Sequence, residues 1–166
     1  NLLCLGGVDL TSSESASAAF EQVAGHLGGI DGLVNVAGGF AWETVEGGSL
    51  LTWDRLYQMN VRTAVVSSQS ALTHLLDSKA GRIVNIASTA GQRGYAYVAA
   101  YVAAKHGVVG LTRALALEMA QKGITVNAVC PGYTETEILR QSIANVVAKT
   151  GRSEADLRAA APALPE

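Results

Sequence analysis

A tyrosine and a lysine four residues apart, Tyr101 and Lys105, have the spacing in this sequence that is best suited to chemistry. On a helix, residues at this spacing lie on one face, one turn apart. A free tyrosine has a pKa of about 10, which is too high for efficient proton exchange at neutral pH. A neighbouring ammonium group favours the phenolate, and lowering the pKa by about three units corresponds to roughly 4 kcal/mol. The pair is therefore a candidate general acid/base.

The elements that must position this pair alternate along the chain between strands and helices. Buried strands are expected in four apolar segments, at 1–9, 31–39, 81–88 and 124–132. Helices are expected at 12–27, 53–77 and 97–121, and Gly123 closes the last of them. This alternation predicts an α/β fold with a doubly wound parallel sheet and helices on both of its faces.

Polar or turn-forming residues follow each expected strand, at Asp9, Asn35–Gly39, Ser88 and Pro131–Gly132. In a parallel sheet the carboxyl ends of the strands share one edge, and ligands bind in the crevice beyond that edge. We therefore expect these residues to gather at one rim, although they span the chain.

This ordered set resembles the short-chain dehydrogenase/reductase family over nearly the whole chain. The resemblance is carried by "NVAG" at 35–38, Asn60, Ser88 thirteen residues before Tyr101, Lys105 and "PG" at 131–132. It implies a Rossmann-like fold and an oxidoreductase that transfers a hydride between NAD or NADP and a secondary alcohol or ketone. The segment "CPGYTETEI" is similar to the 3-oxoacyl reductases and 3-hydroxyacyl dehydrogenases of the family.

The resemblance assigns catalytic roles to four residues. Tyr101 would be the general acid/base, and Lys105 would lower its pKa and hold the hydroxyl groups of the nicotinamide ribose. A cationic nicotinamide ring would lower that pKa further. Ser88 would hydrogen-bond the oxygen of the substrate, and Asn60 would hold a water that links Lys105 to solvent. Tyr95 and Tyr97 lack a lysine at this spacing and are expected to line the cleft or to pack.

The resemblance also implies a cofactor site. Asp9 would meet the adenine amino group, with Leu10 beside it, and Asn35, Ala37 and Gly38 would form the turn beside the adenosine. The family's second asparagine in this turn is Val36 here. The nicotinamide carboxamide would be held by Pro131, Gly132, Thr134 and Thr136.

The family's glycine-rich turn, which holds the pyrophosphate, has no counterpart in the sequence, and neither does the last family strand. We therefore expect one domain over 1–166 that is incomplete at both ends. Two alternatives remain open: a fragment of a longer enzyme, or a truncated, non-catalytic remnant that acts as a binding or oligomerisation subunit. The preference between NAD and NADP cannot be read, because the residues that set it lie in the missing part.

Residues 136–160 are expected to form a lid over the substrate. Leu139, Ile143, Val146 and Val147 form an apolar stripe there, suited equally to an acyl chain or to packing. The helices at 53–77 and 97–121 carry apolar residues on more than one face, and family members commonly pair these helices. The sequence therefore predicts a homodimer or a homotetramer with a small-molecule substrate.

The composition excludes other classes of protein. The 166 residues have a net charge of −2 and no basic patch, which argues against a nucleic-acid partner. The sequence contains no run of 18 apolar residues and no signal peptide, so we expect no membrane span and a cytoplasmic location. Cys4 and Cys130 lie in apolar runs and are expected to be buried free thiols. No cluster of cysteine and histidine has the spacing of a metal site.

Overall fold

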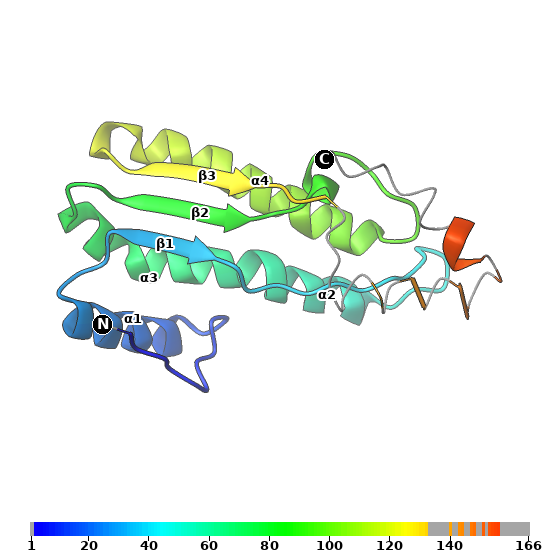
Figure 1. The fold of residues 1–166 in the computed structure, drawn as a ribbon, viewed down its shortest axis with the longest axis horizontal. Helices are drawn as coiled ribbons and strands as arrows, with labels where there is room; N and C mark the ends of the chain where they lie inside the picture. The colour runs from blue at the N-terminus through cyan, green and yellow to red at the C-terminus, as the bar shows by residue number, and fades with distance from the viewer. Residues whose placement is uncertain are drawn as a thin grey trace.

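A parallel sheet of three strands forms the centre of the structure. The computed structural model describes residues 2–132, 140, 143–144, 147–148, 151 and 153–156. The strands β1 (Gly32–Asn35), β2 (Arg82–Ile86) and β3 (Thr125–Val129) lie in the order β1-β2-β3. Figure 1 shows the three arrows pointing the same way, so their carboxyl ends share one edge, as the sequence predicts.

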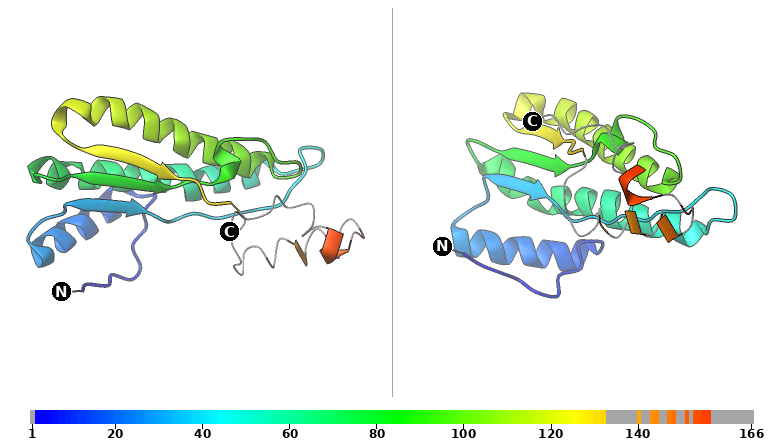
Figure 2. Two further views of the ribbon diagram at one scale, coloured as in Figure 1. Left: turned by 45° about the horizontal axis from the view of Figure 1, so that its top comes forward. Right: turned by 45° about the vertical axis from the view of Figure 1, so that its right-hand side comes forward.

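Between residues 2 and 132, four helices and three short helical turns accompany these strands. The helices are α1 (Ser13–Leu27), which precedes β1, α2 (Leu50–Tyr57), α3 (Thr63–Asp77) and α4 (Ala99–Met119). The turns are the π-helical η1 (Gln58–Arg62) and the 3-10 turns η2 (Thr89–Gly91) and η3 (Ala120–Lys122). α3 and α4 lie behind the strands in Figure 1. Figure 2 shows α1 beside α3.

Local sequence signals set the ends of these helices. The hydroxyl of Ser12 accepts a hydrogen bond from the Ser15 N–H at 3.3 Å and caps α1, which ends at Gly28 with a φ of +84°. Gly123, with a φ of +73°, ends the helical segment formed by α4 and η3. The helix expected at 53–77 begins earlier, at Leu50, because Ser49 caps it, and the turn η1 interrupts it.

The described helices cover one face of the sheet. Leu33, Ile83 and Val126 point toward the helices and are buried. The alternate positions Val34 and Val129 are 58% and 48% exposed, because successive side chains of a strand point to opposite faces. The continuous apolar strands predicted helices on both faces of the sheet. In the described part of the chain, helices cover one face.

The strand expected at 1–9 is not formed. Residues 2–9 have no regular secondary structure, and Leu2 is 86% exposed. A buried parallel strand needs a neighbour with which to exchange backbone hydrogen bonds, and β1 pairs only with β2 among the described residues. Cys4 is consequently exposed, which corrects the expected burial of its thiol, whereas Cys130 is partly buried.

The apolar core has two parts, one at each end of the sheet. The amino-end cluster consists of Ile30, Leu33, Ala71, Leu75, Ile83, Met119, Ile124 and Val126. The carboxyl-end cluster consists of Leu56, Val61, Ala87, Ala100, Ala104, Val108 and Val109. The carboxyl-end cluster therefore lies beneath the edge at which the sequence predicts a ligand. No helix among the described residues is long and apolar enough to cross a membrane.

Candidate active site

The loops that follow β2 and β3 are joined directly beyond the edge of the sheet. The Ala87 N–H donates to the Val129 carbonyl at 2.8 Å, and the Thr89 N–H donates to the Pro131 carbonyl at 2.9 Å. Ser88 lies between these two bonds and begins the turn η2, whose Ala90 N–H donates to its hydroxyl at 3.1 Å. The structure thus places Ser88 and Pro131 side by side, as the sequence predicts.

Tyr101 and Lys105 lie one turn apart on the first half of α4. The Nζ atom of Lys105 is 5.8 Å from the centroid of the Tyr101 ring. The Lys105 side chain is only 6% exposed, and its ammonium donates to the Ile86 carbonyl at 2.9 Å. The end of β2 therefore holds the amine beneath the tyrosine ring.

Close contact between η2 and α4 brings Ser88 to this pair. A Cβ atom on Gly91 would lie 2.7 Å from the Lys105 carbonyl, so only glycine allows this approach. The Ser88 side chain consequently lies near enough to Tyr101 to lower the pKa of its phenol. Ser88, Tyr101 and Lys105 are therefore brought together by β2, η2 and α4.

The electrostatics of the pair differ from the expectation. Burial raises the pKa of Tyr101 above the usual value for tyrosine, and the Ser88 side chain offsets only part of this effect. Burial also lowers the pKa of Lys105, and a charge on Cys130 acts in the opposite direction. A lowered pKa of Tyr101 was expected from the ammonium group. The protein groups instead leave Tyr101 protonated at neutral pH, because burial has a larger effect on its pKa than Ser88 has.

Asn60 lies in the π-helical turn η1 and is 2% exposed. In this turn the Thr63 N–H bonds the Gln58 carbonyl, five residues back. The Asn60 amide nitrogen donates to the carbonyls of Leu56 at 2.8 Å and Gly39 at 3.0 Å. Its amide oxygen accepts from the Gly39 N–H at 3.3 Å. Asn60 therefore fixes the loop after β1, and these bonds engage both the oxygen and the nitrogen of its side-chain amide.

Gly38 lies where Asn60 and Lys105 converge. A Cβ atom at this position would lie 2.8 Å from the Asn60 Oδ1 atom and 3.6 Å from the Lys105 Nζ atom. The Asn60 side chain packs against the Gly38 backbone so closely that only glycine fits here. The loop after β1, η1 and α4 therefore meet at one place.

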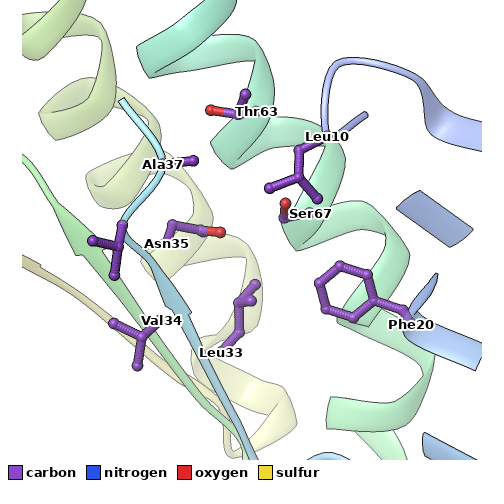
Figure 3. Close-up of a pocket in the computed structure, with 9 residues that line it drawn as sticks. Leu10, Phe20, Leu33, Val34, Asn35, Ala37, Thr63 and Ser67 are labelled. Carbon is purple, nitrogen blue, oxygen red and sulfur yellow. The ribbon is translucent and has the colours of Figure 1, made fainter. Parts of the chain in front are cut away.

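A cavity of about 210 Å³ lies at the carboxyl end of β1. Figure 3 shows Leu10 and Phe20 on one side of it and Leu33, Asn35 and Ala37 on the other, with Thr63 and Ser67 from α3 between them. Its lining is mainly apolar and includes three residues that the sequence predicts beside an adenosine, namely Leu10, Asn35 and Ala37. Asp9 precedes Leu10 but does not line the cavity.

Hydrogen bonds fix the exposed segment that precedes this cavity. The Asp9 Oδ1 atom accepts from the Thr11 N–H at 2.8 Å and from the Thr11 hydroxyl at 2.7 Å. These bonds are the largest cause of the lowered pKa of Asp9, and Arg62 lowers it further. Arg62 also donates to the Thr11 carbonyl at 2.8 Å. Sequence reasoning missed Arg62, because its contact spans 51 residues.

Asn35 belongs to a buried polar network that crosses the sheet. Its amide nitrogen donates to the Asn85 Oδ1 atom at 2.8 Å and to the Ser68 hydroxyl at 3.3 Å. The Asn85 amide in turn donates to the Thr112 hydroxyl at 2.9 Å. The network joins α3, β1, β2 and α4. The Asn35 side chain is thus directed into the fold, and the residue meets the cavity at its edge.

Of the remaining predicted cofactor residues, the structure describes Pro131 and Gly132. Gly132 lies near Thr89, since a Cβ atom on it would be 3.9 Å from the Thr89 Cγ2 atom. Thr134 and Thr136 lie outside the described residues, as does most of the expected lid at 136–160. Within the described part of the chain, no group of three histidine, cysteine or acidic residues could hold a metal ion.

Comparison with known proteins decides the family. The family model described as "short chain dehydrogenase" matches residues 4–147. The chain belongs to the short-chain dehydrogenase family. D-beta-hydroxybutyrate dehydrogenase of Rhizobium meliloti is 37% identical over 146 residues, which cover 88% of this chain and 57% of the relative. A 3-oxoacyl-[acyl-carrier-protein] reductase of Aquifex aeolicus is 37% identical over 131 residues, 79% of this chain and 53% of that reductase.

Solved structures confirm that this short-chain dehydrogenase chain has the Rossmann-like α/β fold. A crystal structure of an F189W actinorhodin polyketide ketoreductase with NADPH superposes with a TM-score of 0.83 at 36% identity. The alignment covers 90% of this chain and 58% of the ketoreductase. The chain therefore spans a little more than half the length of the family members that it matches.

Proposed function

We propose that the protein is an NAD- or NADP-dependent oxidoreductase that interconverts a secondary alcohol and a ketone. The observation that carries the proposal is that Ser88, Tyr101 and Lys105 lie together, with Ser88 near enough to influence the pKa of Tyr101 and the amine buried 5.8 Å from the centre of the ring. Membership of the short-chain dehydrogenase family supports this reading. Relatives named as dehydrogenases and reductases of hydroxy and oxo compounds support it further.

The residues present fit a nicotinamide dinucleotide. The cavity at the end of β1 has a mainly apolar lining and a size suited to an adenine ring. Gly38 packs directly against Asn60 and close to Lys105, so the loop after β1 lies beside the amine proposed to hold the ribose. We assign Asp9, Leu10, Asn35, Ala37 and Gly38 to the adenosine. Lys105 and Tyr101 are assigned to the nicotinamide ribose, and Pro131, Gly132, Thr134 and Thr136 to the carboxamide.

The protein's own groups manage the proton and the substrate oxygen. The Ser88 hydroxyl donates a hydrogen bond to the carbonyl oxygen of the substrate and stabilises the negative charge that develops there. The raised pKa of Tyr101 keeps its hydroxyl protonated, so it can give that proton to the oxygen during ketone reduction. In the opposite direction, the phenolate takes the proton of the alcohol. When bound, a nicotinamide ring supplies the hydride donor or acceptor and, in its oxidised form, a positive charge beside the phenol.

Lys105 and Asn60 act around this step. The Lys105 ammonium stabilises the phenolate after proton transfer. The Asn60 side chain bonds Gly39 and Leu56, so its part in a water relay to Lys105 would come from holding the loop and η1 in place. The names of the relatives favour a 3-oxoacyl or 3-hydroxyacyl substrate as one candidate. The lid at 136–160, the homodimer or homotetramer and the cytoplasmic location are proposed from the sequence alone.

Cofactor binding and turnover by Tyr101→Phe test the proposal together. Fluorescence titration should show saturable binding of NADH or NADPH, and absorbance at the nicotinamide band should report alcohol oxidation. Tyr101→Phe should lower kcat by about 10³-fold, because the proton donor is lost, while Kd for the cofactor changes less than about threefold. Tyr57→Phe, on the exposed face of α2, is the matched control and should retain full turnover. Substantial activity in Tyr101→Phe would remove this residue from its role, and absence of cofactor binding would favour the non-catalytic remnant.

A further inference from the structure

Three aromatic side chains form a wall next to Tyr101. Phe40 meets the Tyr101 ring edge-on, with 4.9 Å between centroids and 72° between ring planes. The Trp42 ring lies 5.7 Å from the Tyr97 ring at 38°. We call Phe40, Trp42 and Tyr97 the aromatic wall. Phe40 and Trp42 lie two residues apart on the loop after β1, so this loop connects the two ring contacts.

Backbone contacts fix the wall to the start of α4. Glu43 and Val98 form a parallel bridge, and the Glu43 N–H donates to the Tyr97 carbonyl at 3.0 Å. This pairing runs the loop alongside the segment that enters the helix. The wall therefore keeps a fixed position relative to the Tyr101 hydroxyl, as a binding surface requires.

Tyr97 has a backbone conformation that its own packing does not explain. Its φ is +67°, and it is the only residue other than glycine with a positive φ among the described residues. A bulky side chain rarely adopts this conformation, and such strain persists where the surroundings enforce it, often at functional sites. Yet the Tyr97 side chain is 57% exposed, so burial does not compensate for the strain. The conformation instead presents a phenol ring opposite Trp42.

The charges near the wall do not favour an anionic substrate. The ammonium of Lys105 is buried and bonded to the Ile86 carbonyl. Arg93 donates from Nε to the Tyr95 hydroxyl at 2.8 Å and lies over that ring. On the wall's own loop, the Glu43 Oε2 atom is buried and has no hydrogen-bond partner among the described residues. The other Glu43 oxygen accepts from the Thr52 hydroxyl at 3.3 Å, and residues 40–43 include no cation that could pair with an anionic substituent.

From these observations we propose that the site takes a secondary alcohol or ketone whose larger substituent is an uncharged aromatic group, held against the aromatic wall. This inference rests on the proposed function, because it places the carbinol carbon at Tyr101. Aromatic rings gain from offset or edge-on contact with other aromatic rings beyond the area that they bury. Tyr97 and Trp42 are then residues that determine specificity, and Phe40 positions the Tyr101 ring.

Substrate preference tests the inference. Wild-type protein should oxidise 1-phenylethanol with a kcat/KM at least about tenfold above those of 2-butanol and 3-hydroxybutyrate. Tyr97→Ala should lower the ratio of kcat/KM for 1-phenylethanol to kcat/KM for 2-butanol by about tenfold. Tyr57→Ala is the matched control, since Tyr57 is 56% exposed on α2, and it should leave the ratio of the two alcohols unchanged. A preference for 3-hydroxybutyrate, or a ratio that Tyr97→Ala does not change, would overturn the inference.

A binding measurement separates this inference from the proposed function. The chain has two tryptophans, so Trp53→Phe leaves Trp42 as the only indole reporter. In this variant, 1-phenylethanol should change the Trp42 emission saturably, whereas 3-hydroxybutyrate should not. Saturation without oxidation of any alcohol would support the wall and contradict the proposed activity. Oxidation of alcohols without a Trp42 response to 1-phenylethanol would support the activity and contradict the wall.

Discussion

The two apolar clusters at opposite ends of the sheet are built from different kinds of residue. The amino-end cluster is composed mainly of large aliphatic side chains, and Leu75 and Ile83 within it are fully buried. The carboxyl-end cluster has alanine at three of its seven positions, and Tyr101 and Cys130 pack against it. Polar side chains as deeply buried as Asn60 and Lys105 lie beside it.

The amino-end cluster therefore contributes mainly to the stability of the fold, and the carboxyl-end cluster mainly to the placement of functional groups. Burial of large aliphatic side chains contributes about 1.5–3 kcal/mol each, so the amino-end cluster stabilises the fold efficiently. Alanines contribute less but allow helices and loops to approach closely, which places functional groups at short distances. The carboxyl-end cluster also contains an amine that burial disfavours in its charged form. We therefore expect substitutions at the two ends to affect different properties.

The largest expected effect on stability comes from the amino-end cluster. Ile83→Ala removes a fully buried side chain and should lower the free energy of unfolding by about 3 kcal/mol, through lost burial and a residual cavity. Urea unfolding would measure it. Val84→Ala, one position along β2 and only partly buried, is the control and should cost about 1 kcal/mol or less. Equal losses in both variants would contradict the view that one face of the sheet is packed.

A smaller effect on stability is expected at Gly38, which packs against Asn60 and Lys105. Gly38→Ala places a methyl group 2.8 Å from the Asn60 Oδ1 atom, which should cost about 1–3 kcal/mol of stability and weaken NADH binding. Gly25→Ala is the control, because Gly25 lies inside α1 with nothing within 4 Å of a new Cβ atom. That change should stabilise the protein by about 0.5–1 kcal/mol. Unchanged NADH affinity in Gly38→Ala would show that cofactor binding does not depend on the close packing of this loop against Asn60 and Lys105.

The smallest effect, and one of opposite sign, is expected at Lys105. Lys105→Met should raise the free energy of unfolding by about 1 kcal/mol at neutral pH, because it removes a buried charge. It should also abolish turnover, because the same amine is proposed to stabilise the phenolate. The pKa of Lys105 is lower in the folded state, so the unfolded state binds more protons at pH values between the folded pKa and 10.5. Wild-type stability should therefore rise with pH through that window.

In Lys105→Met this rise should be reduced. The raised pKa of Tyr101 acts in the opposite direction only above about pH 10, where the unfolded tyrosine ionises and the folded one does not. Urea unfolding at a series of pH values below 10 isolates the contribution of Lys105. Equal slopes in the wild type and the variant would mean that the buried amine costs no stability.

Local signals in the sequence were sufficient for much of the fold. The expected helix at 97–121 is α4, Ala99–Met119, because apolar spacing and Gly123 mark it. The three strands after residue 30 also lie where apolar runs predict them. The run at 1–9 has the same composition but forms no strand, because pairing depends on a neighbour that composition does not reveal.

The closeness of Ser88, Tyr101 and Lys105 was predictable, but the electrostatics around them were not. The spacing of Tyr101 and Lys105 and the resemblance at Ser88 suggest that the three lie near one another, and the structure brings them together. The direction of the Tyr101 pKa was not predictable, because it depends on how deeply the fold buries the phenol. Phe40 and Trp42 were missed because an aromatic residue in a loop gives no periodic signal.

The π-helical turn η1 makes this site sensitive to the deletion of a single residue. A hydrogen bond spanning five residues instead of four accommodates one extra residue, so α2, η1 and α3 amount to a single helix with a one-residue insertion. Deletion of one codon within 58–62 would restore a regular α-helix. The helix would keep its hydrogen bonds, but Asn60 would turn away from Gly39 by about 100°, the rotation per residue of an α-helix. Loss of one residue here would thus leave a folded protein with a displaced loop after β1.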